Sequence, residues 1–289
     1  MPTEPAQIAL AVFELCLFAG GVGLVVWLIG TPGPRTRWLR TNALPPTGVA
    51  LSDFLISAGL ILLTGFALLG ITQLALGGAI AKSADHQGLA LFVYSVANYA
   101  GALLAWKVMF PSLRRSWALS SATPWPEPPA ALPWPRAVRY GTACLLIALP
   151  VLSLISLGWN FLIEKLNLPV TPQDVVAIFT STKSPLVIAG MLLVACLFAP
   201  MYEELLFRAG LYRFCRQRLG RTPALLISGC GFGLLHGNWA GFLPLAILGM
   251  GLAIAYEATG SIRVAIIAHS LFNLNTILVL LSGLPEVAK

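Results

Sequence analysis

Three ionisable side chains stand within six residues of a hydrophobic stretch, in the run Glu203-Glu204-Leu205-Leu206-Phe207-Arg208. A charged side chain at the centre of a bilayer costs roughly 2.5–3.5 kcal/mol on insertion scales, so such groups are rare and usually functional. On a helix, Glu204 and Arg208 share a face at i,i+4 and can pair. Glu203 points about 100° away from Glu204. It has no partner within its own helix, which makes it available as a general base.

Two later hydrophobic segments carry the next polar groups. Phe232 and His236 are spaced i,i+4, and so are His269 and Asn273. The chain has only three histidines, and these segments hold two of them. Counted at 1.5 Å per residue from the cytoplasmic ends of their helices, Glu203, His236 and His269 lie roughly 15, 21 and 10 Å deep. We therefore expect three helices to bring a carboxylate and two imidazoles to one cavity that opens toward the cytoplasm.

Two histidines, a glutamate and an amide suit the hydrolysis of an acyl bond. Glu203, alone or with His236, would deprotonate water. Asn273 and His269 would donate hydrogen bonds to the developing oxyanion, a contribution of about 2.7–4 kcal/mol per donor. The sequence shows no serine or cysteine nucleophile with an identifiable partner.

A catalytic zinc site is the alternative chemistry for the same residues. Glu203, His236 and His269 match a His2Glu ligand set with one position open for water. The usual HExxH zinc helix is absent from the sequence. One divalent metal, most simply zinc, and a metal-free glutamate mechanism both stay open at this point.

The composition places these residues in a membrane protein. Of the 289 residues, 57% are hydrophobic and only 10% are charged, whereas a soluble domain carries about 25% charged residues. The apolar runs reach the roughly 20 residues that a spanning helix needs and lack strict alternation, which favours helices over a barrel. Glu14 lies inside the first apolar run. A structural role, in which its carboxylate is hydrogen-bonded inside the bundle, is favoured over a role in a proton relay. We predict an all-α bundle with eight spans, at 7–30, 54–76, 88–110, 141–161, 185–206, 223–237, 240–257 and 262–283.

The formal charge of +7 reflects membrane topology and not a nucleic-acid partner. Thirteen Lys and Arg residues fall in the turns after predicted spans one, three, five and seven, and four fall on the opposite side. The positive-inside rule then puts both termini outside the cytoplasm. The basic side is also suited to contact anionic membrane lipid.

The chain divides at one proline- and tryptophan-rich segment, residues 111–140. A run such as Pro124-Trp125-Pro126-Glu127-Pro128-Pro129 is expected to be extended. We predict N-terminal transmembrane helices and a cytoplasmic loop over 1–140, and a catalytic transmembrane core over 141–289. Residues 172–179 are predicted to form a short amphipathic helix on the opposite membrane surface, acting either as a lid or as a connector.

The pattern EExxxR, FxxxH and HxxxN in successive C-terminal segments resembles the CPBP family of intramembrane proteases. That family includes the type II CAAX prenyl endopeptidases and bacterial relatives linked to bacteriocin immunity. The resemblance covers roughly residues 141–283, and the motifs here are Glu203, Glu204 and Arg208; Phe232 and His236; His269 and Asn273.

The resemblance implies a bundle of about eight transmembrane helices with a catalytic cavity inside the membrane, in a bacterial plasma membrane. It assigns Glu203 as the base for water with help from His236, and the oxyanion site to His269 and Asn273. Glu204, Arg208 and Phe232 would support that geometry. The implied reaction is cleavage of a membrane-associated protein or peptide, with a prenylated CAAX-type C-terminus as the candidate substrate. The family's members are called metalloproteases, and a metal-free mechanism has also been proposed for them.

A non-catalytic reading uses the same polar groups. Intramembrane carboxylates and histidines also build proton relays, so a proton-coupled transporter or an immunity-type binding protein is the alternative. The sequence shows neither duplicated halves nor paired broken helices of the kind found in transporters. It also retains the glutamate and both histidines, and these features favour catalysis.

Overall fold

The structure is a computed structural model that describes residues 4–33, 44, 49–83, 85–120, 132–167, 182 and 184–282. Within these ranges the regular structure is helical and no strand occurs, which confirms the all-α prediction. The elements are α1 (Glu4–Gly30), α3 (Leu51–Ile80), α4 (His86–Ser120), α5 (Trp134–Lys165), α7 (Pro185–Leu193), η1 (Val194–Phe198), α8 (Ala199–Glu204), η2 (Leu205–Tyr212), α9 (Arg213–Leu219), α10 (Arg221–Leu235), α11 (Trp239–Thr259) and α12 (Ile262–Ser282).

Seven helices of the described chain are long and apolar enough to cross a membrane. Elements α7 to α9 count as one of them, because they follow one another without a break as a single rod over Pro185–Leu219. The predicted sixth span is the exception. Helix α10 has 15 residues, so it rises about 22 Å, less than the ~30 Å hydrocarbon core. The chain is an integral, multi-pass membrane protein.

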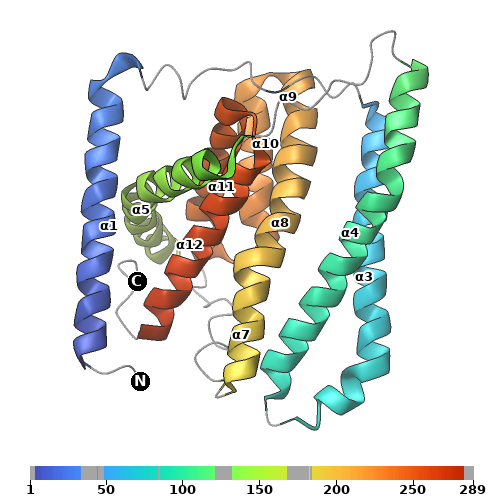
Figure 1. The fold of residues 1–289 in the computed structure, drawn as a ribbon, viewed down its shortest axis with the longest axis horizontal. Helices are drawn as coiled ribbons and strands as arrows, with labels where there is room; N and C mark the ends of the chain where they lie inside the picture. Colours follow the sequence, from blue (N-terminus) through green and yellow to red (C-terminus); the bar gives the residue numbers. More distant parts are fainter. Residues whose placement is uncertain are drawn as a thin grey trace.

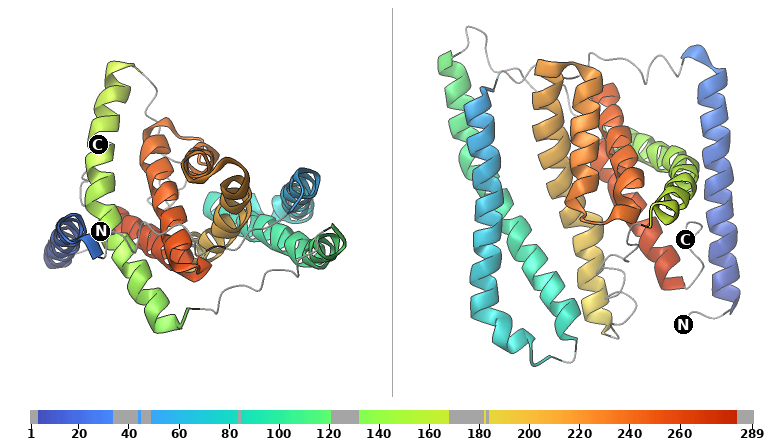
Figure 2. Two further views of the ribbon diagram at one scale, coloured as in Figure 1. Left: turned by 90° about the horizontal axis from the view of Figure 1, so that it is seen from above. Right: turned by 180° about the vertical axis from the view of Figure 1, so that it is seen from behind.

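The rod and α10–α12 form the centre of the molecule, with α1 on one side and the antiparallel pair α3–α4 on the other (Figure 1). Helix α5 lies crosswise. In the view from above, α1 and α3 are seen nearly end-on while α5 runs across the molecule (Figure 2). Its contacts are with α1, α11 and α12, so it closes the side of the central group that faces away from α3–α4.

Small residues allow α10 and α11 to approach closely. Gly229 and Gly233 are one helical turn apart on α10, facing Ala246 and Phe242 of α11. A β-carbon at either glycine would lie 2.6 Å from the facing carbonyl oxygen. This is the small-xxx-small packing that lets membrane helices contact through their backbones. It fixes α10, and with it Phe232 and His236, against the longer α11.

Polar contacts join α1 to α12. Gln7 Nε2 donates to the carbonyl of Ser282 at 2.8 Å, and Asn275 Nδ2 donates to Glu14 Oε2 at 3.2 Å. The beginning of α1 and the end of α12 therefore lie at the same end of the bundle. Glu14 is bonded inside the bundle, as the favoured interpretation of this residue predicted. The side of the membrane on which this end lies stays a prediction.

A charge cluster ties the opposite end together. Glu257 is 1% exposed on α11 and accepts from Tyr212 Oη at 2.8 Å, Arg216 Nε at 2.8 Å and Arg221 Nε at 2.9 Å. These partners come from the end of η2, from α9 and from the start of α10. A buried carboxylate with several charged and hydrogen-bonded partners holds the top of the rod to α10 and α11.

Two of the described helices extend into the segment 111–140 that was predicted to divide the chain. Helix α4 continues to Ser120 and α5 begins at Trp134, so the predicted break over 111–140 is wrong at both of its ends. Residues 113–120 include Arg, Ala and Leu, which favour helix. Proline is also tolerated in a first helical turn, as at Pro135. The extended run 124–129 and the amphipathic helix at 172–179 fall outside the described residues.

Candidate active site

The rod that carries Glu203 and Glu204 is wound more loosely on both sides of them. Segments η1 and η2 are π-helical and flank the six-residue α8. Pro200 stands at the start of α8 and lacks the N–H that would continue the hydrogen-bond ladder. The proline therefore stands between two π-helical segments, a feature frequent at functional sites.

Asn273 satisfies a carbonyl that the π-helix and the proline leave free. In η1 the N–H of Ala199 bonds the carbonyl of Val194, five residues back. The same spacing would pair the carbonyl of Ala195 with residue 200, which is proline and has no N–H. Instead Asn273 Nδ2 of α12 donates to Ala195 O at 2.8 Å. Asn273, the predicted oxyanion donor, thus uses one of its two side-chain N–H groups to hold the rod against α12.

A serine does the same for the second π-helical segment. Ser228 is fully buried on α10, and its hydroxyl donates to the carbonyl of Phe207 in η2 at 3.1 Å. The rod is therefore held by one side-chain donor from α12 and one from α10. The motif spacing does not include Ser228, and its position four residues before Phe232 is the signal that would have placed it on the same face of α10.

Glu204 is the centre of a buried ionic network. Arg208 Nε lies 3.0 Å from Glu204 Oε2, as the i,i+4 spacing predicted, and both side chains are 0% exposed. The other oxygen, Glu204 Oε1, lies 3.0 Å from His269 Nδ1. A carboxylate that faces a guanidinium is ionised and accepts, so Nδ1 of His269 is the donor. This bond orients the imidazole and directs its Nε2 away from Glu204.

Glu203 lies on the other side of that imidazole. Its Oε2 is 3.8 Å from His269 Nε2, and it has no hydrogen-bond partner within the described chain. The residue is only 9% exposed. A buried carboxylate oxygen without a donor is costly and uncommon unless the site has another use for it. Glu203 is thus the less bonded of the two glutamates, as their positions on the helix predicted.

Phe232 links the second histidine to this group. Its ring lies edge-on to His236 at 4.9 Å and to His269 at 5.4 Å between centroids, and the Arg208 guanidinium lies 4.5 Å from it. His236 is half-buried just after the end of α10, and its Nδ1 lies 2.8 Å from the carbonyl of Phe232. A carbonyl only accepts, so Nδ1 is again the donor and Nε2 keeps a lone pair.

The predicted residues thus gather around two centres. Glu203, Glu204 and His269 lie side by side, and Phe232 joins Arg208, His236 and His269. Asn273 lies one helical turn beyond His269, on the carbonyl of Ala195. The three sequence motifs therefore meet in one interior region, at the junction of the rod, α10 and α12.

The predicted metal ligands are only partly brought together. Glu203 and His269 lie close together, and their facing atoms are chemically suited to zinc. However, no three His, Cys, Asp or Glu side chains in the described parts of the chain are gathered closely enough to hold a metal. As placed, Glu203, His236 and His269 do not make the three-ligand site that the sequence allowed.

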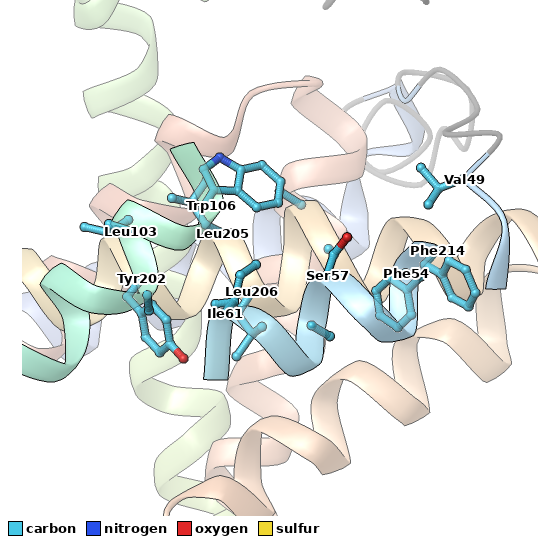
Figure 3. Close-up of a pocket in the computed structure, with 14 residues that line it drawn as sticks. Val49, Phe54, Ser57, Ile61, Leu103, Trp106, Tyr202, Leu205, Leu206 and Phe214 are labelled. Carbon is cyan, nitrogen blue, oxygen red and sulfur yellow. The ribbon is translucent and has the colours of Figure 1, made fainter. Parts of the chain in front are cut away.

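An apolar pocket begins at Tyr202, the residue before Glu203, and runs toward the basic end of the bundle. It has a volume of about 110 Å³ and is lined by α3, α4 and the rod. Tyr202 and Ile61 lie at one end of it, and Val49 with the stacked rings of Phe54 and Phe214 at the other (Figure 3). Tyr202 immediately precedes Glu203, so the pocket leads away from the site. No sequence motif signalled this contribution of α3 and α4.

One comparison with known proteins gives a match. Residues 185–275 match the family model described as Rce1-like, type II CAAX prenyl endopeptidase Rce1-like. Comparisons with curated proteins and with solved structures give no match. The matched segment contains the whole rod, α10, α11 and the part of α12 that bears His269 and Asn273. The family is one of CAAX-type proteases, and residues 185–275 of this membrane protein are similar to it.

Proposed function

We propose that this protein is an intramembrane endopeptidase that hydrolyses a peptide bond of a membrane-associated substrate with water activated by Glu203. The observation that carries the proposal is the contrast between the two adjacent glutamates. Glu204 is held by Arg208 and His269, whereas Glu203 Oε2 is buried with no donor. A carboxylate kept free of partners beside an oriented imidazole is the arrangement that a general base needs.

The reaction begins with transfer of a proton from water to Glu203, while the water oxygen attacks the scissile carbonyl. His269 Nε2 lies 3.8 Å from Glu203 and has a lone pair, because Nδ1 donates to Glu204. The proton can therefore pass from Glu203 to His269. Protonated Nε2 then donates to the oxyanion or to the leaving amine, so that cleavage consumes one water and yields a carboxylate and an amine. His236 Nε2 offers a second proton acceptor.

Asn273 supports the oxyanion in two ways. One N–H holds the carbonyl of Ala195 and so maintains the π-helical segment ahead of Glu203. The amide nitrogen carries a second N–H, which is available to the tetrahedral intermediate. Arg208, Glu204 and Phe232 hold the imidazoles in place and do not touch the reacting atoms.

The substrate we propose carries an apolar chain, and a prenylated C-terminus of CAAX type is the candidate. The pocket at Tyr202 supports this, because its lining is almost entirely apolar and Tyr202 directly precedes Glu203 in the chain. Each buried methylene contributes about 0.8 kcal/mol, so a long chain in this pocket would anchor a short peptide next to Glu203.

We expect Ala58→Trp, which fills the pocket from α3, to raise KM for an isoprenylated quenched-fluorescent peptide at least tenfold. Excluding two methylenes from burial costs about 1.6 kcal/mol, which corresponds to more than tenfold in affinity. The same peptide without the isoprenyl group should show no such change. Leu63→Trp is the matched control, since Leu63 lies on the same helix and is 66% exposed. An equal effect of both variants, or none of Ala58→Trp, would contradict this use of the pocket.

We propose that the reaction needs no metal ion, and a chelator tests this. We expect cleavage by the purified protein to be unchanged after prolonged incubation with a membrane-compatible zinc chelator and dialysis. The reason is that Glu203, His236 and His269 do not lie close enough together in the described structure to bind one metal ion. The opposite result would be a loss of activity that added zinc restores in the wild type but not in His236→Ala. It would show that these side chains come together around a metal during catalysis.

The alternative is a binding or proton-coupled transport protein that uses the same buried groups. It predicts ligand binding or proton movement without any cleavage of peptides by the folded wild-type protein. The family match favours the protease.

A further inference from the structure

The N-terminal helices supply one wall of the site. Helix α8, which carries Glu203, packs against α12 on one side and against α4 on another. The α12 side brings His269 to Glu203. The α4 side brings Tyr99, whose ring lies 5.1 Å from that of Tyr202 between centroids at an interplanar angle of 40°. Tyr99 therefore stands against the residue that precedes the proposed base.

The ring of Tyr99 is held on the side of α8 that faces α4. The ring of Tyr99 belongs to a packed cluster with Ile61, Ala102 and Tyr202, so its direction is set by α3, α4 and the rod. A phenol held in this way offers one O–H donor at a fixed place.

We propose that Tyr99 is a positioning residue for the reaction, which donates its phenolic O–H to the Glu203 carboxylate when substrate is bound and so holds that carboxylate between α4 and α12. This inference rests on the proposed function. Glu203 Oε2 has no donor in the described structure, and the His269 imidazole lies 3.8 Å from it on α12, whereas Tyr99 stands on α4. Hydrogen bonds in catalytic sites are often long before substrate binds and tighten in the complex. The site would then draw on a residue outside the matched segment 185–275 and inside the predicted N-terminal unit 1–140.

The test compares four variants of the protein, purified in detergent and assayed on a quenched-fluorescent membrane peptide that the wild type cleaves. Tyr99→Phe removes only the O–H and keeps the ring against Tyr202. We expect kcat to fall about tenfold or more, because a hydrogen bond to a charged group is lost, with KM and the unfolding temperature unchanged. Tyr94→Phe is the matched control. It removes a phenol from the same helix, but one whose hydroxyl faces Gly77 of α3. We expect it to match wild type.

Tyr99→Leu separates positioning from packing. On our proposal it loses the same kcat as Tyr99→Phe, although it unfolds at a lower temperature. If Tyr99→Phe keeps wild-type kcat and only Tyr99→Leu is impaired, Tyr99 acts through packing alone and the inference is wrong. Glu203→Gln in the same assay keeps the two proposals apart. An inactive Glu203→Gln beside a fully active Tyr99→Phe overturns the role of Tyr99 alone, whereas an active Glu203→Gln overturns the proposed function and the role of Tyr99 with it.

Discussion

Glu203→Gln should reduce peptide cleavage by about 10²–10⁴-fold, the usual contribution of a positioned general acid–base group. The amide has almost the same shape as the carboxylate and accepts no proton from water. The measurement is the initial rate of cleavage of a quenched-fluorescent membrane peptide by equal amounts of folded wild-type and variant protein. A variant that cleaves at the wild-type rate would falsify the assignment of Glu203 as the base.

The same substitution should leave the protein at least as stable as wild type. Glu203 Oε2 is buried and makes no hydrogen bond to the described chain, so removing its charge breaks no such bond. A structural role would predict the opposite, a lower unfolding temperature. Glu14→Gln is the matched control, because Glu14 is also an intramembrane glutamate but bonds Asn275 at the α1–α12 contact. We expect it to cleave within about twofold of wild type, since surface and remote substitutions rarely alter the reacting groups.

Arg208→Met should have the largest effect on stability. Removing one partner of a buried ion pair typically costs about 3–5 kcal/mol, because the other charge stays buried without compensation. Arg208 and Glu204 are both 0% exposed, and Arg208 also contacts the ring of Phe232. We expect a clear fall in the unfolding temperature in detergent and in the yield of folded protein. Activity should fall too, since His269 is oriented by Glu204.

The double variant Glu204→Gln/Arg208→Met should recover part of that stability. It removes both charges, and glutamine can still accept from His269 Nδ1 through its side-chain oxygen. Arg139→Met serves as the control, because Arg139 is exposed on α5 and is expected to change the unfolding temperature little. If Arg208→Met is as stable as Arg139→Met, or if the double variant is no better than the single one, the ion pair does not carry the stability we assign to it.

Local patterns along the chain predicted the parts of the site that depend on one helix. The i,i+4 spacing paired Glu204 with Arg208 and left Glu203 apart, and the structure has both features. Apolar runs predicted eight helices near their observed positions, because a membrane helix satisfies its backbone within its own segment. The ends were less well predicted. Helices α4 and α5 extend into 111–140, and α10 is too short to be a full span.

Contacts between helices were not predictable in the same way. Asn273 pairs with Ala195 because the π-helical segment and Pro200 together leave the carbonyl of Ala195 without a backbone donor. The spacing of residues along the chain does not predict this contact. The acceptors that orient the two histidines, Glu204 for His269 and a backbone carbonyl for His236, likewise depend on how α10 and α12 meet the rod.

The sequence by itself therefore determined the class of protein and the chemical groups available, since composition and helical spacing are local properties of the chain. Tertiary structure alone decided which histidine faces Glu203 and that an apolar pocket lies at Tyr202. It also brought Tyr99, more than one hundred residues earlier in the chain, to the ring of Tyr202. The physical reason is that side chains on different helices meet only where packing sets the crossing and the depth of both helices, and that packing is a property of the whole bundle.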